Sequence, residues 1–427
     1  GFGEARFLFY PPASWGLGAL LGAVLPWVMV PGTFIWIALT AAGFSMFLLA
    51  RRFLSRDHAI VAAAFYAANP YHWVVVYWRS AYAELLAAWL LPLLLLLILR
   101  AREEGRKTIL PLALVIAAAW LTNAPSAVMV NYSLALLVVV VALINRSPRL
   151  LGYGLAAVLL GAALAAFYLV PAAYEEKWVN IAQVLSPGVR PQDNFLFTIL
   201  NDPDHNRFNY LVSTVATAEM LVLVAAAFLA RKFRKHLPQL WWALAAWSVG
   251  IMLLMCPFTL FFWEHLPKLQ FIQLPWRWML CFNVAVTMFI AMGTRRIISR
   301  LVIVLGLAAV LLLVWHRIQP PWWETAEDIA EMHDDFVHGR GYEGTDEYVP
   351  AGGDPYEIKQ DAPRVVWHGS GKMHVQEKLW KPEWKEFTVA VSGPGTLVLR
   401  LFNFPAWNVL VNGHVVSTQT TEETGQM

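Results

Sequence analysis

Apolar runs long enough to cross a lipid bilayer recur along this chain from residue 15 to residue 315. A bilayer core takes about 20 residues of helix. About eleven segments reach or approach that length: 15–30, 33–50, 58–76, 82–99, 108–122, 125–144, 150–170, 211–230, 237–256, 278–294 and 299–315. The chain is 58% hydrophobic and 14% charged, against about half and a quarter in soluble domains. The fold class predicted is an all-α polytopic membrane domain of about 10–11 transmembrane helices.

Basic residues concentrate in five short connections between these runs: 51–56, 100–107, 145–149, 231–236 and 294–300. With the spans above, all five fall on one side, which the positive-inside rule assigns to the cytoplasm. The opposite side then carries the loops 69–84, 171–210 and 257–276 and the chain's tail. The first run does not decide on which side of the membrane the chain starts. Gly1 is cytoplasmic if 15–30 spans, and outside if that piece does not cross.

Beyond the last apolar run the chain becomes polar and is rich in charged residues, glycine and proline. Three regions are therefore predicted: a membrane domain over 1–318, a partly helical linker over 319–371 and a β domain over 372–427. The last region contains strand-like stretches rich in Val, Thr, Phe and Trp between Pro and Gly turns. Asn412-Gly413 is a hairpin signal. We expect a small antiparallel β-sandwich outside the cytoplasm, cut short at Met427.

Several function classes are excluded. A net charge of +3 without a clustered basic face does not indicate nucleic acid as a partner. Cys256 and Cys281 lie in or beside apolar runs and do not form a disulfide framework or a zinc site. P-loop, G-x-G-x-x-G, H-E-x-x-H and nucleophile-elbow motifs do not occur. No span carries the charge series of an ion-coupled transporter.

Arginine beside aromatic residues occurs at two helix entries on the predicted outer side. Arg79 follows Trp78, and Arg277 stands between Trp276 and Trp278. A snorkelling arginine in an interfacial tryptophan belt explains each one alone. Two such positions fit phosphate recognition better, because guanidinium matches phosphate oxygens and stacks on rings. Glu84 near Arg79 is either a functional charge or a carboxylate favoured by a helix N-terminus.

Acidic residues mark the long outer loop. Glu175, Asp193, Asp202 and Asp204 are candidates for a general base toward a hydroxyl acceptor. Asp202-Pro-Asp204 also matches a D-x-D pattern, which allows a divalent metal; no other cofactor is indicated. Asn123, before Pro125, is either a supporting polar residue or a helix cap.

Four stretches together resemble bacterial membrane proteins known as 6-pyruvoyl-tetrahydropterin synthase-related, which are close to the YfhO-like membrane proteins: 69–92, 168–180, 273–280 and 341–350. The tail's FNFPAWNVLVNG resembles a β-domain element of the latter group. That resemblance implies the GT-C glycosyltransferase fold, which takes a sugar from a polyprenyl-phosphate carrier outside the cytoplasm. Arg79 and Arg277 would then hold the carrier phosphate. The catalytic acid in that fold lies in the first outer loop, so Glu4 is a catalytic candidate, as the remnant of that acid or its neighbour. The residues expected to support the site are Tyr82, Glu84, Asn123, Glu175, Gln273, Trp276 and Trp278.

The function expected is that of an inner-membrane glycosyltransferase that modifies a cell-surface polymer or lipid. Its partners would be the bilayer, the polyprenyl-phosphate sugar and a glycan or lipid acceptor. Two alternatives remain open: a transporter or flippase for lipid-linked saccharide, and a non-catalytic envelope scaffold. The soluble, zinc-dependent activity in the family's name has no support in these residues.

Overall fold

The chain consists of two compact units, seen in the computed structural model, which describes residues 2–3, 6–294, 296–319, 325–338, 346–358, 362–381 and 383–427. The helical unit comprises Tyr10–Val170 and Val184–Pro321. The β unit comprises Gly1–Phe9, Pro171–Gln183 and Trp322–Met427. The loop expected over 171–210 is therefore shared between the two units.

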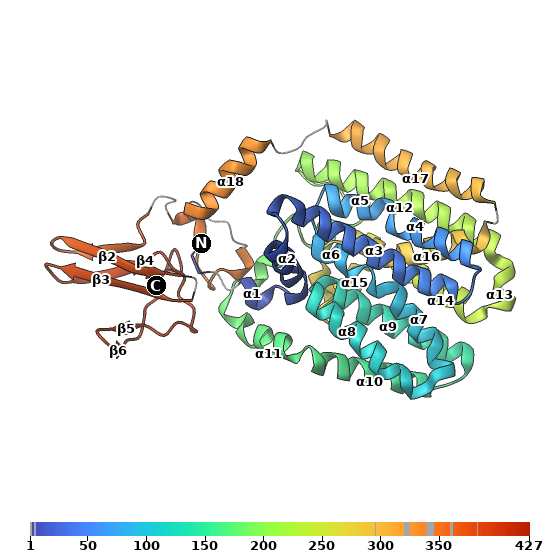
Figure 1. The fold of residues 1–427 in the computed structure, drawn as a ribbon, viewed down its shortest axis with the longest axis horizontal. Coiled ribbons are helices and arrows are strands. Elements are labelled where there is room, and N and C mark those ends of the chain that lie inside the picture. The colour runs from blue at the N-terminus through green and yellow to red at the C-terminus, as the bar shows by residue number, and fades with distance from the viewer. Residues whose placement is uncertain are drawn as a thin grey trace. The chain divides into compact units, whose positions relative to one another are not determined.

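The helical unit is a bundle whose longer helices run side by side (Figure 1). The helices of this unit, long and short, are α2 (Pro12–Val24), α3 (Val30–Arg51), α4 (Arg56–Ala67), α5 (Pro70–Tyr77), α6 (Tyr82–Ala87), α7 (Leu90–Glu104), α8 (Ile109–Thr122), α9 (Ala124–Asn145), α10 (Arg149–Leu164), the first part of α11 (Ala166–Glu175), α12 (Pro203–Leu229), α13 (Phe233–His236), α14 (Pro238–Leu254), α15 (Leu260–His265), α16 (Met279–Gly293) and α17 (Ile297–Ile318). Helix α16 lies at the centre, and almost all its side chains are buried.

Within the described residues, seven helices are long and apolar enough to cross a membrane, or up to nine if each of two bent pairs is one span. The fold class is confirmed: a polytopic helical domain followed by a small β region. Segment 15–30 is broken into the short helix α2 and a 3-10 helix, Trp27–Met29, so it does not count as a long helix. The run Tyr82–Thr122 is counted once, but it contains both expected segments, 82–99 and 108–122, because α7 and α8 pack together across a turn at Gly105 (φ +57).

The basic connections gather at one end of the bundle, here called the basic end. Arg52 contacts Glu103 at 2.7 Å, which ties the α3–α4 turn to the α7–α8 turn. Gln239 donates to Asn145 at 2.6 Å, which ties α14 to the end of α9. A cavity described below joins the segments 53–58, 232–236 and 291–294. The opposite end of the bundle is called the far end.

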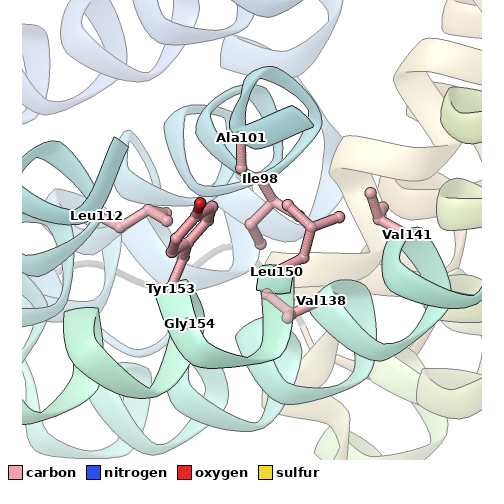
Figure 2. Close-up of a pocket in the computed structure, with 8 residues that line it drawn as sticks. All are labelled: Ile98, Ala101, Leu112, Val138, Val141, Leu150, Tyr153 and Gly154. Carbon is pink, nitrogen blue, oxygen red and sulfur yellow. The ribbon is translucent and has the colours of Figure 1, made fainter. Parts of the chain in front are cut away.

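Glycine lets α10 approach its neighbours closely. A Cβ on Gly161 would lie 2.8 Å from Ile116 Cβ and 2.9 Å from the Ala113 carbonyl oxygen on α8. Small residues at helix contacts are the usual means of close packing in membranes. Figure 2 shows the nearby junction of α7, α8, α9 and α10, where Tyr153 and aliphatic side chains surround a gap of about 10 Å³. That volume holds at most one water, so the gap is a packing feature.

The β unit is built from antiparallel strand pairs. Its elements are α1 (Arg6–Phe9), α18 (Ala326–His338), β1 (Val365–Gly369), β2 (Met373–Trp380), β3 (Lys385–Val391), β4 (Gly395–Leu399), β5 (Leu410–Val411) and β6 (His414–Val415). The pairs are β1–β4, β2–β3 and β5–β6. The predicted Asn412-Gly413 hairpin joins β5 to β6, and both residues have positive φ, at 53° and 81°. Two positive φ angles in sequence are the signature of a type I′ turn.

A small apolar core holds three separate parts of the chain together in the β unit. Phe2, Val179 and Phe402 are buried in one cluster. The backbone N–H of Phe402 donates to the Phe2 carbonyl at 2.8 Å, and that of Asn180 donates to the Val349 carbonyl at 2.9 Å. The start of the chain and the 171–183 segment are thus parts of the β unit.

Candidate functional site

The turn between α5 and α6 places a cation beside an anion at the far end of the bundle. The Asn69 side chain caps α5, accepting from the His72 N–H at 3.0 Å. Helix α5 ends at Tyr77, and a turn with Ser80 at φ +48 leads into α6. Arg79 lies in this turn and Glu84 in the first turn of α6. Arg79 Nη1 contacts Glu84 Oε2 at 2.7 Å.

A second arginine reaches the same carboxylate from the other half of the helical unit. Arg277 lies in a short 3-10 helix, Pro275–Trp278, directly before α16. Its Nη1 donates to the Ile272 carbonyl at 2.7 Å and to Gln273 Oε1 at 3.1 Å. These two acceptors fix the side chain with Nε 3.4 Å from Glu84 Oε2. The structure therefore brings Arg79 and Arg277 together, with Glu84 between them.

Glu84 is the centre of this cluster. Its Oε1 accepts from the Tyr71 hydroxyl at 2.6 Å, and its Oε2 faces both guanidinium groups. The side chains of Arg79, Glu84 and Arg277 are only 12%, 3% and 13% exposed. Among the described residues, the cluster has one carboxylate for two guanidinium groups. A buried charge is costly unless it is paired, so the positive excess favours a further anion.

Aromatic side chains surround the arginine cluster. The Arg79 guanidinium lies 4.9 Å from the Trp276 ring centroid, a cation–π distance. Trp276 and Trp278 are 1% and 2% exposed. An interfacial anchor would present its indoles to lipid, so the structure contradicts the plain anchor interpretation of this segment. Tyr82 is half-buried, with its ring 5.9 Å from that of Phe34.

Three buried N–H donors in this segment have no hydrogen-bond acceptor within the part of the chain that the structure describes. They are Trp276 Nε1, Trp278 Nε1 and Arg277 Nε, of which Arg277 Nε faces Glu84 Oε2 at 3.4 Å as an ion pair without a hydrogen bond. A buried donor left unpaired costs about 1–3 kcal/mol. The far-end segment is therefore rich in donors and poor in acceptors, which is the composition of an anion site.

Asp193 is occupied by its own loop. Its carboxylate accepts from the Gly188 N–H and from Arg190 Nε, both at 2.8 Å. The Asp193 backbone carbonyl contacts His205 Nε2 at 3.0 Å, which ties the loop to α12. These contacts give Asp193 a role in loop structure.

Asp202 and Asp204 also serve local structure. Asp202 caps α12, accepting from the Asp204 and His205 N–H groups at 3.0 and 3.2 Å. Asp204 is exposed and pairs with Arg207 at 3.0 Å. Among the described residues, no group of three or more His, Cys, Asp or Glu side chains is placed to hold a metal ion.

The remaining candidates lie apart from the arginine cluster or outside the described residues. Glu175 ends α11 in the segment assigned to the β unit. Asn123 is a helix cap, because its Oδ1 accepts from the Ser126 N–H at 2.9 Å. Gln273 is part of the cluster, and its Nε2 donates to the Val184 carbonyl at 2.7 Å. Glu4 lies outside the described residues.

Sequence reasoning missed Tyr71 and a polar group deeper in the bundle. Glu219 on α12 is fully buried, with neither oxygen hydrogen-bonded within the described residues. Asn283 of α16 lies beside it, but the Asn283 amide donates to Asn69 Oδ1 at 3.1 Å. A lone Glu inside the apolar run 211–230 was the available signal. Tyr71 gave no such signal, because its contact depends on how α5 packs against α6.

Comparison with known proteins places the chain in a family. The model of a family described as "6-pyruvoyl-tetrahydropterin synthase related domain; membrane protein" matches residues 7–320. No curated protein matches the chain, and no solved structure does. The matched region contains the whole arginine cluster and most of the chain. The chain therefore belongs to the family of 6-pyruvoyl-tetrahydropterin synthase-related membrane proteins, and it is a multi-pass membrane protein.

Proposed function

We propose that the chain is a glycosyltransferase that takes a sugar from a polyprenyl-phosphate carrier at the extracytoplasmic face of a bacterial cytoplasmic membrane. Arg79 and Arg277 bind the carrier phosphate. The acceptor is a cell-surface polymer or lipid. The observation that carries the proposal is the buried pair of guanidinium groups with a single carboxylate between them.

The charge of the cluster suits the reaction. In transfer, the acceptor hydroxyl oxygen bonds to the anomeric carbon as the bond from that carbon to the phosphate oxygen breaks. The electron pair leaves with the phosphate, which changes from a singly charged diester to a more highly charged monoester. The hydroxyl proton passes to a base. Groups that stabilise the developing charge more than the ground state lower the barrier. Arg79 and Arg277 supply that stabilisation.

The unpaired donors support the same assignment. A phosphate has several acceptor oxygens, and a guanidinium fork binds them with two parallel hydrogen bonds. Arg277 Nε is ion-paired with Glu84 at 3.4 Å but makes no hydrogen bond there, so a phosphate oxygen can take that place. Glu84 holds the two arginines in place while the phosphate is absent.

The base that accepts the proton is a separate question from the phosphate site. Asp193 and Asp202 are engaged in loop and cap contacts, and this argues against their acting as the base. Glu4 remains the candidate for a residue near the base, as the family resemblance implies.

The test uses the purified full chain in lipid nanodiscs with a panel of polyprenyl-phosphate hexoses. Arg277→Ala should abolish sugar release from the carrier. Arg207→Ala is the matched control, because Arg207 is an exposed arginine that is also paired with a carboxylate. Full activity of Arg277→Ala would overturn the phosphate role. Movement of intact lipid-linked sugar across the bilayer without sugar release would favour the flippase alternative.

A further inference from the structure

A cavity of about 460 Å³ opens at the basic end of the bundle. It lies where the α3–α4 turn, the segment around α13 and the end of α16 meet. Ligand sites in proteins have volumes of about 300–1,000 Å³. This volume greatly exceeds the space for one water that is found between α7 and α10.

Basic side chains line this cavity. Lys232, His58 and His236 are among its lining residues, and Lys232 and His236 are exposed. No acidic residue is among the described residues that line it. The acid next to His58 in sequence, Asp57, lies in the first turn of α4 and is not part of the lining.

The same cavity has an apolar part. Phe53, Phe233 and Met292 contribute to its wall, and Met292 is buried. A cavity that combines nitrogen donors with apolar walls fits an amphiphile better than a free ion. The basic clusters at this end predict the cytoplasmic leaflet, whose anionic lipids attract such groups.

A buried arginine fixes one wall of the cavity. Arg300, on α17, donates to the Thr294 and Ala291 carbonyls at 2.6 and 3.2 Å and from Nε to Thr294 Oγ1 at 3.0 Å. Thr294 and Ala291 are lining residues. These contacts hold the Arg300 side chain against the end of α16, which forms one wall of the cavity.

We infer that this cavity is a binding site for the phosphate headgroup of an anionic phospholipid. Lys232, His58 and His236 contact the phosphate, and the acyl chains begin along Phe53 and Phe233. The site lies at the opposite end of α16 from Arg277. A helix of 15 residues separates the two by about 22 Å. The inference is independent of the proposed function.

The test measures lipid binding to the purified full chain by native mass spectrometry and by thermal shift. The probes are short-chain phosphatidic acid, phosphatidylcholine of the same chain length, and inorganic phosphate. The variant Lys232→Ala with His236→Ala removes two cavity side chains. The matched control, Arg234→Ala with Lys235→Ala, removes at least as much positive charge from the same segment outside the cavity lining.

Phosphatidic acid should bind at least tenfold more tightly than phosphatidylcholine. The cavity variant should lose about fivefold or more of that affinity, and the control should stay within twofold. Equal losses in both variants, or no preference for phosphatidic acid, would overturn the inference. Inorganic phosphate binding as tightly as the lipid would overturn the lipid assignment. Lys232→Glu, a single change at an exposed position, gives the same readout if the double variant is unstable.

Discussion

Arg277 Nε lies 3.4 Å from Glu84 Oε2, although the two residues belong to opposite halves of the helical unit. Glu84 also contacts Arg79, so one buried carboxylate connects the α5–α6 turn to the start of α16. This relationship makes the far-end cluster a structural joint, and the proposed function makes it an anion site as well. The two roles predict different responses to substitution.

Glu84→Gln tests whether the Glu84 carboxylate balances the two buried arginines. Removing the carboxylate leaves two buried guanidinium groups without an anion, which should cost about 3–5 kcal/mol. The melting temperature in nanodiscs should fall, and polyprenyl phosphate should restore more of it than it adds to the wild type, because the ligand supplies the missing anion. An unchanged melting temperature, or an equal ligand shift in both proteins, would show that Glu84 does not balance the arginines.

Tyr71→Phe tests how the carboxylate is held. The Tyr71 hydroxyl donates to Glu84 Oε1, and a hydrogen bond to a charged group contributes about 1.5–3 kcal/mol. Tyr66→Phe is the matched control, since Tyr66 is equally buried and donates to the Ala88 carbonyl. Both variants should have a lower melting temperature, but only Tyr71→Phe should weaken polyprenyl phosphate binding. A similar loss of binding in both would assign the effect to general packing.

Gly161→Ala tests the close contact of α8 and α10. The added Cβ would lie 2.8 Å from Ile116 Cβ, so the helices must separate. Overpacking of this kind costs about 1–3 kcal/mol. Gly152→Ala on the same helix has nothing within 4 Å of its new Cβ and should keep or slightly raise the melting temperature, because alanine favours a helix over glycine by about 1 kcal/mol. If the two variants have the same melting temperature, the helices are not in close contact at Gly161.

Glu219→Met tests the carboxyl group buried in α12. Neither oxygen has a hydrogen-bond partner among the described residues, so the group carries a desolvation cost of about 1–3 kcal/mol. An apolar side chain of similar length should therefore raise the melting temperature. A fall of several degrees would mean that Glu219 makes a contact that stabilises the fold.

Sequence patterns predicted the parts of this structure that depend on local composition. Apolar runs located most spans, and Asn412-Gly413 located the hairpin because only a few residues accept two positive φ angles in sequence. The sequence placed Arg79 and Arg277 at helix entries on one predicted side, and the family resemblance implied that both hold one phosphate.

Contacts between segments that are distant in the chain could not be predicted from the sequence. Glu84 was expected near the membrane surface, but its place between two arginines depends on how α6 packs against the start of α16. Asp193 and Asp202 were predicted as catalytic candidates, and their loop and cap contacts could not be predicted, because composition alone does not show which backbone N–H groups a carboxylate will face. The assignment of residues 171–183 to the β unit also depends on a long-range pairing, Val179 with Pro350.

The most direct test of the central claim is the binding of polyprenyl phosphate, without any sugar, to wild-type chain and to Arg277→Ala in nanodiscs. Removing one guanidinium should weaken binding at least tenfold, because a charge-assisted hydrogen bond contributes about 1.5–3 kcal/mol. Arg207→Ala should bind like the wild type. Binding by Arg277→Ala that equals the wild type would show that the far-end cluster does not hold the carrier phosphate.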